Sequence, residues 1–337
     1  MERIRLLVAV LIVTLSCCGP VTDPRPSDAD LVPPQVLSVG ATSSRDVRIE
    51  FDEEATLVEG KTRIAPDLGT PSVSGTGREL TLSAGEQSPG RPYTLEAEAQ
   101  DTHGNTASFL AGFYGWNPHV PRLLISELTP RGSDTHPDFV ELAVMTDGDM
   151  GGVALLVGTP ANFEERLVFP SFSVTKGSFI VVHMKPTGDP AEVDEPGDPT
   201  LSSGADTSST AYDFWMRDAK GLGSNNGAVT LVARPGGECL DAVLYSNRTS
   251  QSDEAYRGFG STAMMNRADE LVSLGAWTAA GTRILPEDAV NPEESTATRS
   301  LCRASSLADT NGSDDWHVVP TRKASPGTVN TDEVYAP

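Results

Sequence analysis

Polar and apolar residues alternate over several stretches of this chain, and this alternation constrains the fold more than any other sequence feature. Tyr93, Leu95, Ala97 and Ala99 alternate with polar side chains, and residues 47–51 repeat the pattern. A period of two places successive side chains on opposite faces of a β-strand, so that one face is buried and the other solvated. Glycine and proline clusters interrupt these stretches about every ten residues, as in β-sandwiches. The sequence therefore predicts an all-β fold.

Chain length and charge limit the organisation and the partners. The 337 residues, 38% of them hydrophobic, suffice for two domains with a core each. The formal net charge of −22 argues against a nucleic-acid partner, because affinity for phosphates comes largely from lysine and arginine. It argues equally against docking on anionic lipid through basic patches. We expect an acidic protein of two domains that does not bind nucleic acid.

The N-terminus has the layout of an export signal, which we place at residues 1–18. Two arginines precede an apolar stretch at residues 6–15, which is too short to cross the ~30 Å of membrane hydrocarbon as a mature helix. The stretch leads into Cys17 and Cys18 and resembles the lipobox of bacterial lipoproteins, in which a cysteine becomes the first mature residue and carries acyl chains. The resemblance predicts lipidation at Cys17 or Cys18. The alternative is an ordinary cleaved signal followed by two incidental cysteines.

Residues 19–34 separate this signal from the first predicted strand. Five prolines lie there among polar residues. Because proline fixes φ and disfavours helix, the segment is expected to be an extended, solvated tether. Several acyl chains on one cysteine would hold the protein stably on a membrane surface. The expected location is the bacterial cell envelope, with a lipid anchor at the periplasmic face of the outer membrane or at the cell surface.

Residues 35–118 close with a characteristic pair of motifs. The segments 92–95 (PYTL) and 101–105 (DTHGN) resemble the last hairpin of bacterial Ig-like domains found in surface and S-layer proteins. The resemblance implies a β-sandwich that acts as a spacer or stalk. It also makes His103 a turn residue rather than a metal ligand.

Six further motifs follow in order over residues 123–330. They are ISE (125–127), DFVEL (138–142), GSFIVV (177–182), NNGAVTL (225–231), DAVLY (241–245), and a closing DW (315–316) with SPGTVN (325–330). This order resembles the lamin-tail domain, an Ig-like β-sandwich found in nuclear lamins and in many bacterial exported proteins. The resemblance implies a second sandwich over residues 120–332.

The second predicted domain is longer than most lamin-tail domains, and two inserts account for the excess. Residues 184–212 are rich in proline and acidic residues and are expected to form a solvated loop. Residues 246–296 are richer in helix formers and are expected to be mostly helix and loop. Five of them recur at helical spacing, which predicts a helix between Ser261 and Leu274 that packs across a sheet edge or the end of the sandwich. These five are Ala263, Met264, Ala268, Leu271 and Val272.

Catalytic motifs are mostly absent from the sequence, and the one match, Ser-x-x-Lys at residues 173–176, lies in a strand-rich region without its partner motifs. The sequence has no phosphate loop, Gly-x-Ser-x-Gly elbow, Cys-x-x-Cys pair or His-Glu-x-x-His, so we predict no catalytic residue and no cofactor. Asp134, His136 and Asp138 offer oxygen and imidazole donors at alternate positions and are weak candidates for a divalent metal, with Glu127 or Glu141 as a further ligand. Because the lamin-tail resemblance places a variable polar loop there, and structural carboxylates at Glu127 and Glu141, we expect no metal.

Two cysteines remain besides the pair at the end of the signal. An exported protein can form disulfides, and the lamin-tail resemblance brings the segments around Cys239 and Cys302 close together. The resemblance therefore predicts a Cys239–Cys302 bridge. The alternative is two isolated buried thiols.

These features together favour a non-enzymatic, membrane-anchored lipoprotein. Its lamin-tail module would bind a protein or glycan ligand or have a structural role in the envelope. The alternative is an accessory or metal-dependent hydrolase of the cell envelope, because lamin-tail domains also occur fused to exported nucleases and phosphatases. No stretch of chain remains for a separate catalytic domain once the two predicted sandwiches are counted, and this favours the first function.

Overall fold

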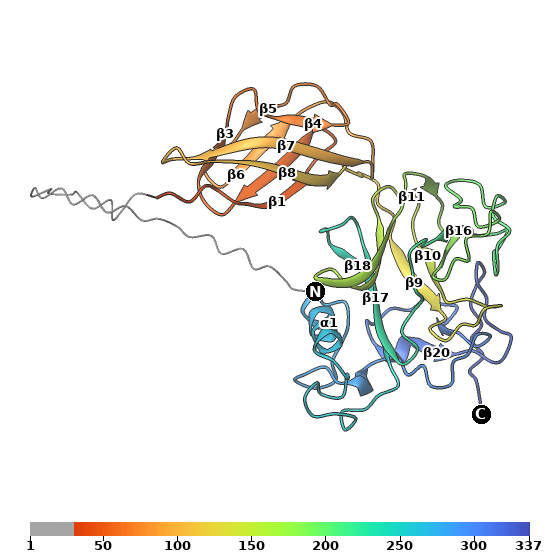
Figure 1. Cartoon of the computed structure of the whole chain (residues 1–337). Helices are drawn as coiled ribbons and strands as arrows, with labels where there is room; N and C mark the ends of the chain where they lie inside the picture. The colour runs from red at the N-terminus through yellow and green to blue at the C-terminus, as the bar shows by residue number, and fades with distance from the viewer. Residues whose placement is uncertain (1–29) are drawn as a thin grey trace, which may run out of the picture.

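The computed structural model describes residues 30–337 as a mostly β protein (Figure 1), which confirms the predicted predominance of strands. The predicted signal peptide, the candidate lipidation sites Cys17 and Cys18, and most of the tether lie outside the described residues. Within these residues, no helix is long and apolar enough to cross a membrane. The strands form two units, β1–β8 and β9–β20, each with its own main hydrophobic core.

The N-terminal unit contains two sheets. In one the strand order is β1-β2-β6-β5, and in the other β7 pairs with β3 and β4 along one side and with β8 along the other. Its strands are β1 (Val36–Ala41), β2 (Asp46–Phe51), β3 (Ala55–Leu57), β4 (Arg63–Ala65), β5 (Ser72–Ser74), β6 (Glu79–Ser83), β7 (Pro92–Asp101) and β8 (Thr106–Tyr114). As the alternation predicts, Tyr93, Leu95, Ala97 and Ala99 of β7 all point into the core, where each is at most 3% exposed.

The C-terminal unit has a six-stranded sheet, ordered β16-β15-β10-β9-β19-β20, a four-stranded sheet, ordered β13-β12-β17-β18, and the short pair β11-β14. All pairings are antiparallel except that of β15 with β16. The strands are β9 (Leu123–Leu128), β10 (Phe139–Val144), β11 (Gly148–Asp149), β12 (Ala154–Thr159), β13 (Asn162–Val168), β14 (Ser173–Val174), β15 (Phe179–His183), β16 (Tyr212–Trp215), β17 (Asn226–Val232), β18 (Cys239–Ser246), β19 (Leu301–Arg303) and β20 (Trp316–Val318). The helices are α1 (Thr262–Ser273) and the 3-10 turns η1 (Pro286–Asp288) and η2 (Ser313–Asp315).

One hydrophobic core joins the two large sheets of this unit. Ile125 and Leu142 from the six-stranded sheet and Val229 and Val243 from the four-stranded sheet belong to the same cluster of buried residues. Strands β9, β10 and β12 are buried along both faces. Loops and the C-terminal segment therefore cover sheet faces that would otherwise be solvated.

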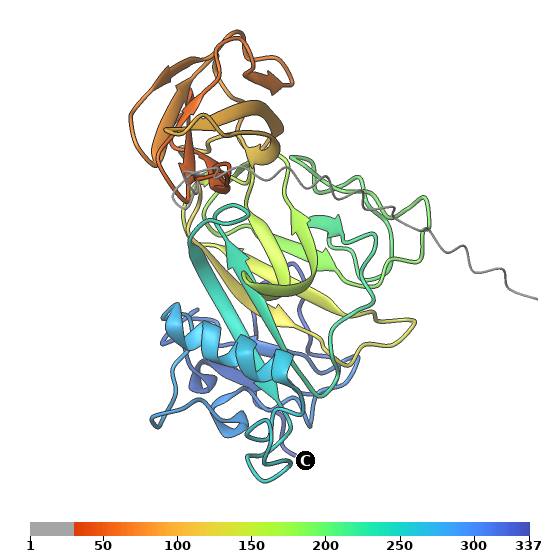
Figure 2. The same cartoon turned by 60° about the vertical axis from the view of Figure 1, so that its left-hand side comes forward.

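Helix α1 confirms the helix predicted in the second insert. It begins after Ser261, whose hydroxyl accepts a hydrogen bond from the Met264 amide at 3.1 Å, as an N-cap should. It packs against β12 and β17 (Figure 2). Met264, Ala268 and Leu271 are buried as predicted.

Two of the five apolar residues predicted to form the buried stripe of the helix are not buried, because the stripe is narrower than the sequence suggests. Ala263 and Val272 are exposed. Arg267 takes a place in the stripe and is 8% exposed. Its guanidinium donates to the backbone oxygen of Asn162 at 2.8 Å and pairs with Glu164 at 3.0 Å. The charged side chain can be buried because the edge strand β13 satisfies it.

The first insert, residues 184–212, forms a loop with no helix or strand before β16, and most of its residues are exposed or half-buried. Its composition does not predict that Glu195 is completely buried in it and accepts hydrogen bonds from the backbone amides of Ser202 at 2.6 Å and Asp213 at 2.8 Å. An acidic residue becomes buried when amide donors surround it. Glu195 thereby holds this loop against β16.

The two units meet closely beside the chain that joins them. The side chain of Asn117 donates to the backbone oxygens of Asp149 and Gly151 at 2.7 and 2.9 Å. Gly90 approaches Gly152 so nearly that a Cβ atom on Gly90 would lie 2.1 Å from the Gly152 nitrogen. No strand of one unit pairs with a strand of the other among the described residues.

Candidate functional site

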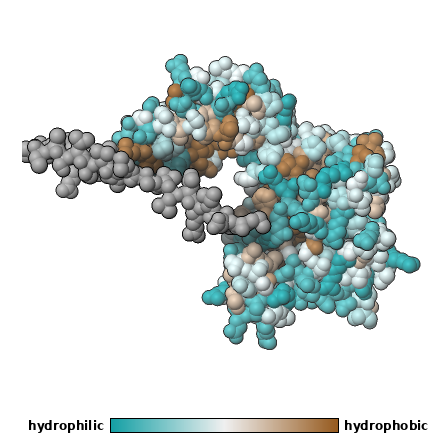
Figure 3. Space-filling model, viewed as in Figure 1, coloured by the Kyte–Doolittle hydropathy of each residue, from teal (hydrophilic) through white to brown (hydrophobic). Residues whose placement is uncertain are grey.

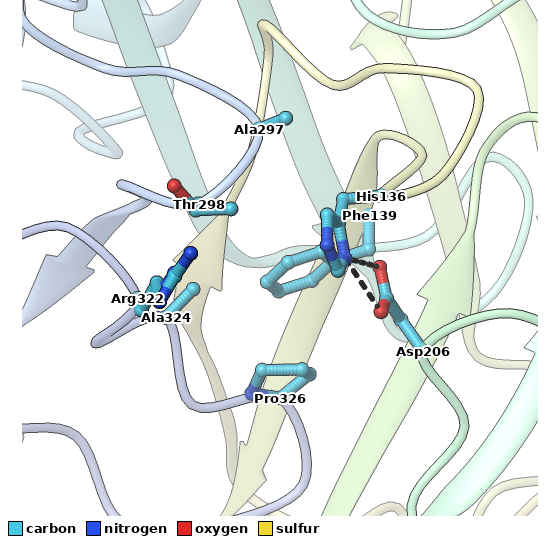
Figure 4. Close-up of a pocket in the computed structure, with 8 residues that line it drawn as sticks. All are labelled: His136, Phe139, Asp206, Ala297, Thr298, Arg322, Ala324 and Pro326. Atoms are coloured by element: carbon cyan, nitrogen blue, oxygen red, sulfur yellow. Dashed lines mark hydrogen bonds and ion pairs between the residues drawn. The ribbon is translucent and has the colours of Figure 1, made fainter.

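A cavity of about 310 Å³ opens on the C-terminal unit, between loops that come from distant parts of the sequence (Figure 4). Its lining comes from the β9–β10 loop, strand β10, the 184–212 insert, the loop before β19 and the C-terminal segment. The lining residues are His136, Phe139, Asp206, Ala297, Thr298, Arg322, Ala324 and Pro326. The site therefore exists only after the whole unit has folded.

One wall of the cavity carries a histidine–aspartate pair. The Nδ1 atom of His136 lies 2.9 and 3.2 Å from the two carboxylate oxygens of Asp206. Because a carboxylate only accepts, Nδ1–H is the donor, and Nε2 is left for other partners. The loop is held by the Ser133 hydroxyl, which accepts from the His136 amide at 3.1 Å, and by the Ser133 amide, which donates to the His136 oxygen at 2.7 Å. The imidazole is thus held in a defined orientation.

The opposite wall carries a cation. Arg322 and Thr298 lie across the cavity from His136 (Figure 4). The backbone amide of Arg322 donates to the Thr298 oxygen at 2.8 Å, and Arg322 has a φ of +66°, a left-handed conformation that non-glycine residues seldom adopt. Within the described part of the chain, the Arg322 guanidinium forms no ion pair. It is available to a ligand.

The floor of the cavity is rigid and apolar. Phe139 on β10 is only 3% exposed and packs with Ala143, Phe179 and Val181 on the outer face of the six-stranded sheet. Pro326, in the C-terminal segment, lines the cavity at the bottom of the view in Figure 4. An apolar floor between polar walls would orient a ligand by its polar groups.

Two buried carboxylates hold the C-terminal segment that supplies Pro326. Glu127 on β9 accepts from the Ser325 amide at 3.0 Å and also bonds the Ser300 hydroxyl. Glu141 on β10 accepts from the Gly327 amide at 2.7 Å and from the Ser126 hydroxyl at 2.6 Å. Because both carboxylates bind backbone amides and serine hydroxyls, they hold the chain in place, as expected for structural carboxylates.

The environment of this pair perturbs both pKa values in the same direction. Burial raises the pKa of Glu127 above its ordinary value, against the effect of its serine hydrogen bonds. Burial raises the pKa of Glu141 further, and the nearby charge of Glu127 adds to the effect. Both carboxyl groups therefore hold their protons more tightly in the folded unit than in the unfolded chain.

The structure does not gather the three weak metal candidates of the β9–β10 loop. The Asp138 carboxylate is buried, accepts from the amides of Gly132 and Leu222 at 2.7 and 2.8 Å, and pairs with Lys185 at 3.3 Å. Asp134 is exposed, and His136 turns to Asp206. Among the described residues, the group of side chains that could hold a metal ion lies instead in the N-terminal unit.

That group consists of Asp30, Asp101 and His103, whose ligand atoms lie within 4.8 Å of one another. Asp101 also organises the turn as the DTHGN motif predicts, because one of its oxygens accepts from the amides of His103 and Asn105, both at 2.8 Å. Asp30 could not be found from the motif, since it lies far from the turn in the sequence.

The predicted disulfide is wrong in this structure, where both cysteines are free. Cys239 begins β18 at the edge of the four-stranded sheet, and its thiol contacts the Asp241 oxygen at 3.6 Å. Cys302 lies in the other sheet on β19, and its sulfur is 3.5 Å from Nε2 of His317. Burial raises the pKa of the Cys239 thiol to about 11 and that of Cys302 further still. Burial therefore disfavours the thiolate form of both cysteines in the folded protein.

Fold and site together define a β-rich protein of two units, with a polar cavity on the second. The chain belongs to the TP_1001 second-domain family, described as "protein second domain", whose model matches residues 121–318. The matched region contains His136, Asp206 and Thr298, whereas Arg322 and Pro326 follow it.

Part of the chain is also similar to a bacterial protein. The chain is 32% identical over 159 residues to a protein of Treponema pallidum (strain Nichols) that is described only as uncharacterized. The similarity covers 47% of this chain and 40% of the relative. The chain thus spans well under half of the relative's length.

Proposed function

We propose that this chain is an exported, lipid-anchored protein of the bacterial envelope that displays its C-terminal unit for binding and performs no catalysis. The apolar stretch that leads into Cys17 and Cys18 supports the anchor, and the proline-rich segment 19–34 supports a tether. The motifs of the two units support an Ig-like spacer followed by a lamin-tail β-sandwich. The observation that carries the binding function is the cavity of Figure 4, with a free cation and an oriented imidazole on opposite walls.

The walls of the cavity favour an acidic ligand group. A guanidinium binds a carboxylate through two parallel hydrogen bonds, and Arg322 has no such partner in the described chain. His136 offers Nε2 from the other side, while Ala324 and Pro326, both half-buried, supply an apolar surface for the rest of the ligand. A carboxylate on an envelope protein or glycan matches this arrangement.

One feature favours the hydrolase alternative. An imidazole oriented by a carboxylate is the arrangement of a general base. The one hydroxyl in the cavity lining that could serve as a nucleophile, that of Thr298, lies on the wall opposite His136 (Figure 4). The group of described residues that could hold a metal ion lies in the other unit. The cavity lining therefore offers the imidazole no adjacent nucleophile and no such group of metal ligands, and we favour binding over hydrolysis.

A titration of small anions tests the cavity. The His136 imidazole signals of the full soluble chain, with Cys17 and Cys18 replaced by serine, should shift saturably with acetate or inorganic phosphate. Arg322→Gln should weaken this binding, and Arg283→Gln, which alters an arginine lining a different cavity, should not. Absence of a saturable shift would contradict the proposal. Ester or phosphodiester hydrolysis that His136→Ala abolishes would establish the enzymatic alternative.

The anchor is tested separately. Cells that express the wild-type chain should incorporate labelled fatty acid into it, and the protein should sediment with membranes. The variant with Cys17→Ser and Cys18→Ser should be unlabelled and soluble. Membrane association that persists in this variant, with no label in the wild type, would rule out lipidation.

A further inference from the structure

A second binding groove lies where the two units meet. Two adjoining cavities, of about 370 and 260 Å³, share the lining residues Val39, Gly40, Ala41, Arg234 and Pro235. The N-terminal unit contributes strands β1, β7 and β8 and, in the smaller cavity, Arg48 of β2. The C-terminal unit contributes the β17–β18 turn and, in the larger cavity, strand β13. The groove is therefore present only when both units are in place.

The groove is cationic, although the chain is strongly acidic. Its lining includes Arg48, Arg166 and Arg234 and no acidic residue, while the whole chain carries 47 acidic and 25 basic residues. Arg234 lines both cavities, and the other two arginines lie one in each. The positive groups are thus spread along the groove rather than gathered at one point.

The two arginines of the larger cavity form no close ion pair with a described residue, although Arg166 also lines a neighbouring cavity that contains acidic residues. Among the described residues, neither Arg166 nor Arg234 forms an ion pair, whereas Arg48 lies 3.8 Å from the exposed Glu79. The Arg234 guanidinium carbon is 5.4 Å from the centre of the Trp116 ring, at a distance suited to a cation–π interaction. Stacking positions the guanidinium and leaves its N–H groups free to bind an anion.

The surface between these charges offers apolar groups and open backbone. Tyr93 and Phe113 of the lining are at most 4% exposed, but Pro92 is exposed and Tyr114 is half-buried. Figure 3 shows hydrophobic residues on the lower side of the N-terminal unit. The C–H faces of sugar rings can pack on such groups while charged substituents reach the arginines. Gly40 exposes bare backbone, because nothing lies within 4 Å of a Cβ atom placed there. A glycine of this kind lets a ligand approach the main chain closely.

We propose that this groove binds a linear acidic glycan, in which sugar rings lie along β1 and β8 and their carboxylate or sulfate groups contact Arg166, Arg234 and Arg48. The spread of the arginines matches a polymer that repeats its charge at intervals. The glycan would also contact both units and so favour their observed arrangement. This site is distinct from the cavity of Figure 4.

Calorimetric titration of the full soluble chain with a hexamer of galacturonic acid tests the proposal, and Trp116 supplies a fluorescence signal. The hexamer should bind, neutral maltohexaose should not, and added salt should weaken the binding. Arg234→Gln and Arg166→Gln should each weaken it about tenfold, the loss expected for a charge-assisted hydrogen bond. Gly40→Val should abolish it by filling the groove, with an unchanged circular dichroism spectrum, since the backbone there suits any residue and the space is open.

The titrations are carried out in the Arg322→Gln background, which removes the cation of the cavity in Figure 4, and Arg283→Gln should leave the affinity in that background unchanged. The proposal is overturned if the hexamer does not bind in this background, if Arg234→Gln leaves its affinity unchanged, or if Gly40→Val has no effect. It is also overturned if hexaglutamate binds as tightly as the acidic sugar, because the groove would then select acidic peptides.

Discussion

The two units of this protein bury their strands in different ways. In the N-terminal unit, β7 alternates between buried and exposed residues along most of its length, and solvent covers one face of the strand. In the C-terminal unit, β9 and β10 are buried on both faces, and the outer face carries polar residues such as Ser126, Glu127 and Glu141. One unit is held together by a simple core, and the other also depends on buried polar networks beneath its loops.

This difference explains why the second unit supports a site. A buried polar group must be hydrogen-bonded, so each one fixes the loop that supplies its partner. Glu127 and Glu141 fix the segment 325–330, and Glu195 fixes the 184–212 insert. Both of these loops line the cavity of Figure 4. In the N-terminal unit the exposed strand faces hold no such loops.

Replacement of Arg303 should produce the largest loss of stability in the C-terminal unit relative to the N-terminal unit. Arg303 is completely buried on β19, pairs with Asp241 at 3.2 Å and Asp315 at 3.1 Å, and donates to the Ile125 oxygen at 2.9 Å. Arg303→Met leaves these carboxylates without their cation and should cost the C-terminal unit about 3–5 kcal/mol. Urea unfolding of a Trp116→Phe background, followed by fluorescence, reports this unit, because the other three tryptophans, Trp215, Trp277 and Trp316, all belong to it.

The N-terminal unit should keep its stability in the Arg303 variant. Its unfolding can be followed by amide hydrogen exchange in β7, whose core has no contact with Arg303. A parallel loss of protection in β7 would show that the two units unfold as one. That result would remove the energetic distinction drawn between them.

Truncation of a side chain on the buried face of α1 should cause the next largest loss of stability. Leu271→Ala removes a completely buried side chain from α1 and should destabilise the C-terminal unit by about 2–5 kcal/mol. The neighbouring Val272→Ala is the matched control, because Val272 is 36% exposed and its truncation should change stability by less than about 0.5 kcal/mol. Equal losses from both variants in thermal unfolding would contradict the observed orientation of the helix.

Much of the fold could be predicted from the sequence because its signals are local. The alternation in β7 and the helical spacing around Leu271 arise from neighbouring residues, and both elements form where predicted. Val272 was misplaced because an apolar residue beside the buried stripe has the same spacing signal as one within it. The burial of Glu195 in the 184–212 insert could not be predicted, because composition does not show that amides surround this residue.

The site was beyond sequence reasoning because its contacts are not local. His136 and Asp206 are 70 positions apart, and Arg322 comes from near the end of the chain. The β9–β10 loop was recognised as polar, but its histidine was grouped with Asp134 and Asp138, its neighbours in sequence. The bridge between Cys239 and Cys302 failed for a related reason, since the resemblance indicated neighbouring segments and the strands lie in different sheets.

The buried carboxylate pair should give the C-terminal unit a distinct pH dependence. Because the folded-state pKa of Glu141 is raised well above its ordinary 4.5, the folded protein binds this proton more tightly than the unfolded chain. The resulting stabilisation is fully present below pH 4.5 and is lost as the pH rises through the raised folded-state value. Glu141→Gln, which cannot ionise, should flatten this decline in urea unfolding measured from pH 4.5 upward. Glu59→Gln, at an exposed site in the other unit, should leave it unchanged.

The smallest effect should come from an ion pair of the N-terminal unit. Arg63 and Glu96 face each other across β4 and β7 with 2.5 Å between the guanidinium nitrogen and a carboxylate oxygen, but their side chains are 74% and 50% exposed. Water and salt screen such a pair, so Arg63→Met should change the unfolding free energy by less than about 1 kcal/mol. The same chemical change at Arg303 is expected to cost several times more, because burial rather than distance decides the value of a charge pair. A loss at Arg63 as large as that at Arg303, measured by urea unfolding in 0.15 M salt, would show that the exposed sheet of the first unit also depends on its charges.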